Sequence, residues 1–182
     1  MKNTALFAAS LALLAASGAQ AQHAQHQAAQ ELVEYPIGEP KVVNALEVGA
    51  VYLAPIDLDP AGIDLPASQS DVHLEADIRA TEGNPNGFGA GEFVPYLSVS
   101  YRLENKDTGK VQTGNFMPMV AIDGPHYGSN VKLPGAGNYK LTYHIEPPAR
   151  QGFGRHTDKA SGVGKWFEPF EVEYDFTYVP LK

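Results

Sequence analysis

Cysteine is absent from this chain of 182 residues. Without thiols the protein can form no disulfide bond, no thiolate zinc site and no thiolate-bearing blue-copper centre. Any metal ion must therefore be held by imidazole, carboxylate, thioether or backbone oxygen ligands. The absence of cysteine also leaves no residue to acylate, so we do not expect a lipoprotein.

Positive charge and long apolar runs are both scarce. The 13 Lys and Arg residues are outnumbered by 21 Asp and Glu residues, which gives a formal net charge of −8. This surplus of negative charge argues against nucleic acid or anionic lipid as a partner and is compatible with cations. No segment approaches the roughly 20 apolar residues that a transmembrane helix needs, so we expect no membrane insertion.

Residues 1–21 have the layout of a secretory signal peptide. A basic start at Lys2 precedes an apolar run over residues 5–16, and the tripeptide at 19–21 matches an A-x-A cleavage site. We therefore expect export of the protein, most simply into a bacterial periplasm.

Residues 22–30, QHAQHQAAQ, are polar and repetitive, which predicts a flexible linker. Its two histidines, His23 and His26, fit either a solvated linker or an accessory metal-collecting tail. Residues 31–182 then form one domain with a sizeable core.

Alternation of apolar and polar residues predicts β-strands along this domain, because successive side chains of a strand point to opposite faces. Four segments show the pattern: residues 72–80, 96–105, 138–146 and 170–179. NKDTGK (105–110) predicts a hairpin loop whose return strand covers residues 111–119, whereas IDGPHYGSN (122–130) is typical of a turn. Short strands separated by such turns predict an all-β, antiparallel β-sandwich.

Two His-x-Glu pairs lie on the polar faces of predicted strands. His73 and Glu75 share one face, with their Cβ atoms about 6.5–7 Å apart given the rise of a strand. That separation suits two ligands of one ion, and it equally suits two solvated side chains. His144 and Glu146 repeat the same spacing, so the pattern alone does not distinguish a ligand pair from a surface pair.

Two further histidines lie among glycines. Met119 precedes His126 by seven residues, and Gly124 and Pro125 restrict how the backbone can aim the imidazole ring. Met119 fits either a soft metal ligand or core filler. His156, in GFGRH, fits a loop histidine that has no role or that is held by a nearby carboxylate such as that of Asp158.

Together these residues form a candidate set of non-thiolate ligands from three segments: His73, Glu75, Met119, His126 and His156. A mixed imidazole, thioether and carboxylate site suits copper best, and ferrous iron is compatible through the imidazoles and the carboxylate. Because imidazole must be neutral to bind, metal affinity is expected to fall below about pH 6.5.

Several long motifs resemble the bacterial periplasmic iron-transport family, small exported proteins associated with ferrous iron uptake. The resemblance covers about residues 31–179. Its motifs are EYPIGEP (34–40), DVHLEADIRA (71–80), NPNGFGAGEFVPYL (84–97), FMPMVAIDGPHYGSN (116–130) and GFGRHTDKASGVGKWFEPF (152–170).

The resemblance implies an immunoglobulin-like β-sandwich that forms a homodimer. It also implies a copper site of three histidines and a methionine with a nearby glutamate, a site that accepts manganese as a surrogate for iron. Carried over to this chain, the ligands are His73, Met119, His126 and His156, with Glu75 beside them. An inner-membrane iron permease is the implied partner, and the protein is expected to be a carrier rather than an enzyme.

Three other functions remain open from the sequence. A periplasmic copper carrier would use the same ligands, and tight copper binding would not separate it from an iron carrier, because copper outbinds iron in most such sites. A copper-dependent ferroxidase-like protein would add turnover with ferrous iron and oxygen. An adhesin-like sandwich with surface histidines would leave the five candidate ligands far apart.

Overall fold

The computed structural model describes residues 32–181. The predicted signal peptide (1–21) and linker (22–30) lie outside the described residues. Among the residues that are described, no helix is long and apolar enough to cross a membrane.

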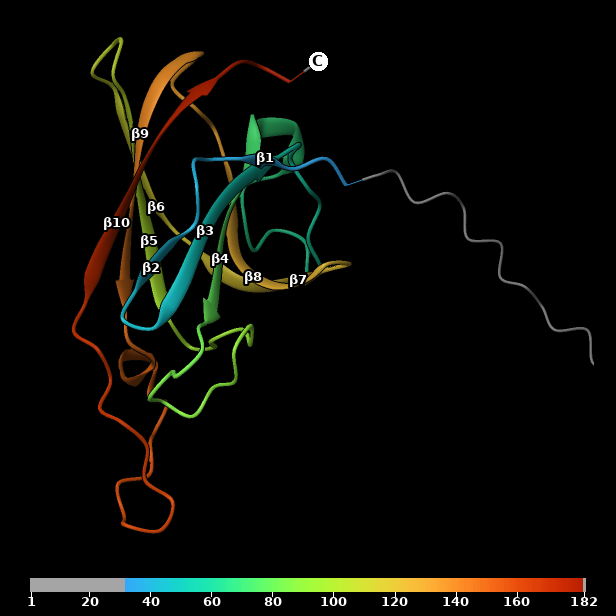
Figure 1. Cartoon of the computed structure of the whole chain (residues 1–182). Helices are drawn as coiled ribbons and strands as arrows, with labels where there is room; N and C mark the ends of the chain where they lie inside the picture. Colours follow the sequence, from blue (N-terminus) through green and yellow to red (C-terminus); the bar gives the residue numbers. More distant parts are fainter. Residues whose placement is uncertain (1–31, 182) are drawn as a thin grey trace, which may run out of the picture. The chain divides into compact units, whose positions relative to one another are not determined.

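Two antiparallel sheets make up the domain (Figure 1). The six-stranded sheet runs in the order β1-β3-β4-β8-β7, with β2 also paired to β3. Its strands are β1 (Tyr35–Pro36), β2 (Lys41–Val43), β3 (Leu46–Leu53), β4 (Val72–Ala80), β7 (Met117–Ala121) and β8 (Gly124–Val131). The four-stranded sheet, in the order β10-β9-β5-β6, contains β5 (Ser98–Asn105), β6 (Val111–Asn115), β9 (Gly137–Glu146) and β10 (Phe170–Tyr178). Two short 3₁₀ segments, η1 (Ala67–Gln69) and η2 (Pro148–Gln151), lie in connections.

The hydrophobic core fills the space between the two sheets. On β4 the side chains of Leu74, Ala76 and Ile78 are buried in this core. Two tyrosines bridge the layers with hydrogen bonds: the Tyr143 hydroxyl donates to the Glu75 carbonyl at 2.7 Å, and the Tyr174 hydroxyl donates to the Val48 carbonyl at 2.7 Å. The predicted all-β sandwich is therefore confirmed, and these hydrogen bonds link β9 to β4 and β10 to β3.

Alternation predicted four strands well. The segment 72–80 is β4, and β5, β9 and β10 begin or end within two residues of the predicted bounds. In each strand one face packs in the core while the other carries polar side chains, which is the arrangement that produces the period of two.

Two predictions were wrong. Residues 111–119 do not form one return strand, because the chain crosses between the sheets at the buried Phe116, whose ring packs against Tyr101 and Tyr143. Of residues 122–130 only Ile122 and Asp123 form a turn, since Gly124–Val131 form the strand β8 between β4 and β7. The strand β3 had no counterpart among the predicted segments.

Candidate metal centre

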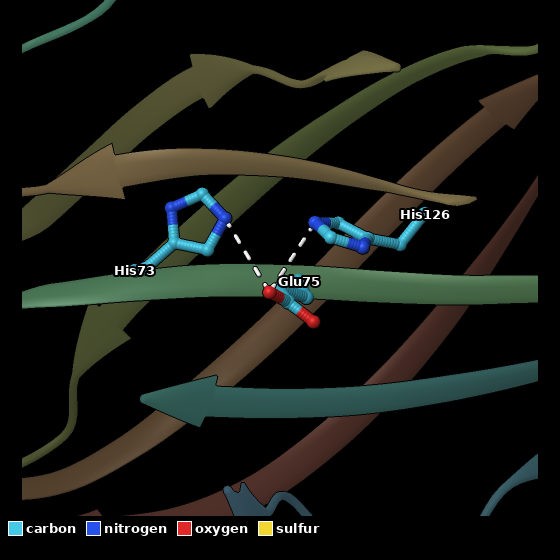
Figure 2. Close-up of side chains that lie close together, drawn as sticks. All are labelled: His73, Glu75 and His126. Atoms are coloured by element: carbon cyan, nitrogen blue, oxygen red, sulfur yellow. Dashed lines mark ion pairs between the residues drawn. The ribbon is translucent and has the colours of Figure 1, made fainter. Parts of the chain in front are cut away.

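Two neighbouring strands bring three candidate ligands together on the face of the six-stranded sheet that points away from the core (Figure 2). His73 and Glu75 alternate with the core residues of β4, so their side chains leave the opposite side of the strand. On β8, Gly128 lies opposite Glu75, and His126 two residues earlier shares its face. The spacing of β4 and the register of β8 therefore place both imidazoles beside one carboxylate.

The geometry of these three side chains fits a metal ion. The Nε2 atoms of His73 and His126 lie 3.5 and 3.3 Å from Glu75 Oε1. Two ligand atoms bound to one ion at about 2.1 Å stand about 3.0–3.5 Å apart, so these separations match a shared ion. Each Nε2 is buried and has no hydrogen-bond partner among the described residues, although buried polar groups are normally satisfied. An ion between the three groups would satisfy both nitrogens.

Asn130 determines which nitrogen of His73 faces the site. The amide group of Asn130 donates to the carbonyls of Ile56 and Leu65, both at 2.8 Å, which fixes its oxygen on the other side. That oxygen accepts from the Ile56 N–H and lies 3.1 Å from His73 Nδ1. Since the amide oxygen can only accept, Nδ1 carries the proton and the lone pair of Nε2 faces Glu75.

Gly128 leaves room for the His73 ring. A Cβ atom at position 128 would lie 2.6 Å from His73 Nε2 and 3.1 Å from the ring carbon Cε1. No side chain larger than hydrogen fits here without moving the imidazole. The glycine that weakens β8 as a strand is therefore required by the site beside it.

Burial keeps both imidazoles neutral. His73 is fully buried, and desolvation lowers its pKa to about 4, against a smaller opposing effect of the hydrogen bond to Asn130. Desolvation also lowers the pKa of His126, and the nearby carboxylates of Asp77 and Asp123 oppose this shift. Neutral imidazole is the form that binds metal ions.

The carboxyl group of Glu75 is held in its protonated form near neutral pH. Burial is the largest cause that raises the pKa of Glu75, and the negative charges of Asp77, Glu34 and Asp123 act in the same direction, which together bring it to about 8. A divalent cation would relieve both effects, because it replaces the proton and neutralises the surrounding charge.

Met119 and His126 are directly opposite each other on the paired strands β7 and β8. Directly opposite residues project to the same face with Cβ atoms about 5 Å apart, and Met119 is only half-buried. Met119 does not belong to the hydrophobic core, so the structure does not support the alternative in which Met119 is core filler. Its thioether lies on the side of the sheet that carries the three ligands.

His156 lies apart from this cluster within a single chain. It is exposed on the long loop between η2 and β10, which extends away from β7 and β8 (orange in Figure 1). Its Nδ1 lies 2.8 Å from the Ser161 hydroxyl, and that hydroxyl donates to Asp158 at 2.7 Å. Hydrogen bonds from Ser161 and the Ala160 backbone hold the pKa of Asp158 below its usual value.

The second His-x-Glu pair is a surface pair. His144 is on the exposed face of β9, where Nε2 lies 3.8 Å from Glu146 and Nδ1 lies 3.7 Å from Glu171. The two carboxylates flank opposite sides of the ring, so the three groups do not converge on one point. Burial and convergence therefore distinguish His73 from His144, and neither is visible in the local sequence.

The sandwich and the His-Glu-His cluster define a β-sandwich protein of the metal-binding class. The chain belongs to the Fe2+ transport protein family, whose family model matches residues 31–180. A UPF0423 protein of Brucella abortus (strain 2308) is 52% identical over 184 residues, which cover 98% of this chain and 95% of that protein.

Solved structures of two bacterial proteins match the fold and much of the sequence. FetP from uropathogenic Escherichia coli strain F11, in a copper-bound variant, is 62% identical with a TM-score of 0.81, over 82% of this chain and 95% of that one. Copper-reconstituted P19 from Campylobacter jejuni is 54% identical with a TM-score of 0.81, over 82% of this chain and 99% of that one.

Proposed function

We propose that this chain is the periplasmic metal-binding component of a high-affinity iron uptake system. It binds copper and iron, with manganese as a surrogate for iron, and passes iron toward an inner-membrane permease without catalysing a reaction itself. The observation that carries the proposal is the pair of buried, unpartnered Nε2 atoms on either side of Glu75. Membership in an iron-transport family and copper in the structures of FetP and P19 support the same assignment.

In this proposal His73 and His126 anchor the ion, and Glu75 gives up its proton to it. Met119 supplies a soft thioether that favours copper, whereas the Glu75 carboxylate favours a harder ion such as iron. Glu34, Asp77 and Asp123 add negative charge close to Glu75, which attracts cations to the site.

The homodimer supplies the remaining ligand. His156 of one protomer would complete the site of its partner, which reconciles its implied role with its exposed position away from the cluster of its own chain. Mixed dimers test this arrangement. If His156 acts across the interface, a dimer of one His126→Ala protomer and one His156→Ala protomer keeps one complete site. If His156 acts within its own chain, the mixed dimer keeps none.

Calorimetric titration tests the site itself. Cu(II) and Mn(II), and Fe(II) without oxygen, are titrated into metal-stripped mature protein beside the variants His126→Ala and His144→Ala. We expect one saturable site per chain that His126→Ala abolishes and His144→Ala leaves intact, because His144 lies on the solvent face of the other sheet. Binding that survives His126→Ala and is lost in His144→Ala would contradict the proposal.

A periplasmic copper carrier is the second candidate, and the thioether of Met119 beside the imidazoles favours it. Affinity does not separate the two functions, because copper binds such ligands more tightly than ferrous iron. Growth of a strain that lacks the gene for this protein separates the two functions. Impaired growth on low iron supports the iron carrier, and sensitivity to copper with normal growth on low iron supports the copper carrier.

A further inference from the structure

The loop that carries His156 contains a hydrogen-bonded chain of three side chains. His156 Nδ1 lies 2.8 Å from the Ser161 hydroxyl oxygen, and Ser161 donates its proton to Asp158 Oδ2 at 2.7 Å. The backbone N–H groups of Ala160 and Ser161 donate to the other oxygen of Asp158 at 2.9 and 3.0 Å. Asp158 thus accepts all three of the hydrogen bonds that Ser161 and Ala160 donate to it.

The order of donors fixes the tautomer of His156. A serine hydroxyl has one proton, and here that proton is committed to a carboxylate that only accepts. The Ser161 oxygen is therefore left to accept, so the proton of a neutral His156 ring sits on Nδ1. The lone pair of Nε2 then points away from Ser161 and is available to a ligand outside the loop.

The loop holds this arrangement with its backbone. Within it, Val163 donates to the His156 carbonyl at 3.1 Å, and Gly162 donates to the Asp158 carbonyl at 2.9 Å. A Cβ atom at position 162 would lie 2.5 Å from the Asp158 carbonyl oxygen, so the turn requires glycine. The His156 ring is therefore presented by a closed loop rather than by a free chain.

Both ends of the loop are attached to the domain. Near its start the Phe153 ring stacks on Tyr96, with ring centroids 4.8 Å apart and an interplanar angle of 16°. At its end the Gly164 N–H donates to the Pro85 carbonyl at 2.7 Å, and the Asn86 amide donates to the carbonyls of Gly164 and Lys165. These anchors limit how far the loop can swing.

We infer that Ser161 and Asp158 are positioning residues for His156, which they hold as the Nδ1–H tautomer so that Nε2 is presented to a metal ion. The inference rests on the proposed function, in which His156 is a ligand. Asn130 does the same for His73. Its side-chain N–H groups donate to the carbonyls of Ile56 and Leu65, so only its amide oxygen faces His73 Nδ1. Outer partners of this kind fix ring orientation and raise the basicity of the ligand nitrogen.

His144 shows what an unpositioned histidine on this chain looks like. Its ring nitrogens lie 3.8 and 3.7 Å from carboxylates, beyond hydrogen-bond range, and its side chain is 43% exposed. Within residues 32–181 no hydrogen bond to the His144 ring selects one of its two tautomers. His144 is therefore the internal reference for the ring of His156 in any spectroscopic comparison.

Long-range ¹H–¹⁵N NMR of the imidazole rings in metal-free mature protein tests the inference directly. We expect the Nδ1–H pattern for His156 in the native chain, and a shift toward the Nε2–H pattern of a free imidazole in Ser161→Ala and Asp158→Asn. Ser161→Thr keeps a hydroxyl and should restore the native pattern. Thr157→Ala, which removes a hydroxyl that makes no hydrogen bond in residues 32–181, is the matched control and should leave the spectrum unchanged.

Copper titration of the same variants links the tautomer to the site. We expect Ser161→Ala to weaken Cu(II) binding by about 10-fold, the lower end of the range for outer partners of ligating histidines, with Ser161→Thr close to the native protein. An unchanged His156 tautomer in Ser161→Ala would overturn the inference. If the tautomer shifts while His156→Ala binds Cu(II) normally, the positioning stands and the ligand role of His156 in the proposed function fails.

Discussion

Replacing Gly128 by alanine tests the candidate site at its tightest contact. Gly128 lies on β8 opposite Glu75, and an added Cβ would stand 2.6 Å from His73 Nε2. Ordinary contact at this point begins at about 3.4 Å. The His73 ring must therefore move by about 0.8 Å, because the alternative is a shift of the strand β8 against β4.

The His73 ring has little room to make that movement. It is fully buried, and its Nδ1 is tied to Asn130 at 3.1 Å. A binding site tolerates displacements of about 0.5 Å, so the shift takes Nε2 out of position for the ion. We expect Gly128→Ala to weaken Cu(II) binding by about 10- to 100-fold, the range seen when ligand orientation is disturbed. Crowding a packed site should also destabilise the metal-free protein by about 1–3 kcal/mol.

Competition titration with a chelator measures the affinity, and denaturant unfolding of the metal-free protein measures the stability. Gly49→Ala is the matched control, since Gly49 lies on β3, on the other side of β4, and its added Cβ would meet Asp77 at an ordinary 3.4 Å. This control should change neither quantity by much. Native Cu(II) affinity in Gly128→Ala, with the fold intact by circular dichroism, would refute the position assigned to the His73 imidazole.

Three further predictions concern the same site. Because Glu75, with its pKa raised to about 8, must lose a proton to bind, metal affinity should rise about tenfold per pH unit up to pH 8, and Glu75→Gln should flatten this dependence in calorimetry between pH 6 and 9. Met119→Leu keeps side-chain volume, so thermal unfolding should change little while Cu(I) affinity drops in a competition assay. Asn130→Ala leaves two carbonyls and His73 without partners, so denaturant unfolding should show a loss of about 3 kcal/mol. A metal affinity of the native protein that is flat between pH 6 and 8 would contradict the first prediction. Native Cu(I) affinity in Met119→Leu would contradict the second, and unchanged stability in Asn130→Ala the third.

The pH prediction differs from the one that the sequence supports. From free imidazole we expected affinity to fall below about pH 6.5. In the structure the pKa of His73 is lowered to about 4, so this ring is already neutral at pH 5.5 and adds little to the dependence above that pH. The proton on the Glu75 carboxyl group is then the one that the ion must displace. The pH dependence of metal affinity therefore extends up to about pH 8, the raised pKa of Glu75. Burial causes both shifts, and local sequence does not reveal burial.

One of the strands that sequence reasoning missed, β8, carries His126 and so contributes to the candidate site. Gly124, Pro125 and Gly128 make residues 122–130 resemble a turn, since glycine and proline are poor strand formers. In the structure Gly128 serves the site because it admits the ring of His73, and Pro125 directly precedes His126 near the beginning of β8. Local rules fail most often where function requires an unusual residue, and β8 is such a place.

The candidate ligands could be named from the sequence, whereas their hydrogen-bond partners could not. Alternation places His73 and Glu75 on one face of a strand, and β4 occupies the predicted residues 72–80. Asn130 and Ser161 were not singled out, because an asparagine and a serine gain their roles only from tertiary hydrogen bonds. The exposure of His156 had no local signal either, and a single chain does not bring it to the other ligands.

The alternation of β4 places core residues on one face of the strand and the candidate metal ligands His73 and Glu75 on the other. A slip of one residue against β8 would turn His73 and Glu75 into the space between the sheets and point Leu74 outward. A chain misaligned in this way would lose its hydrophobic packing and its metal affinity in one step. Metal binding would then report the strand register, since only a sandwich with correctly aligned strands presents the candidate ligands together.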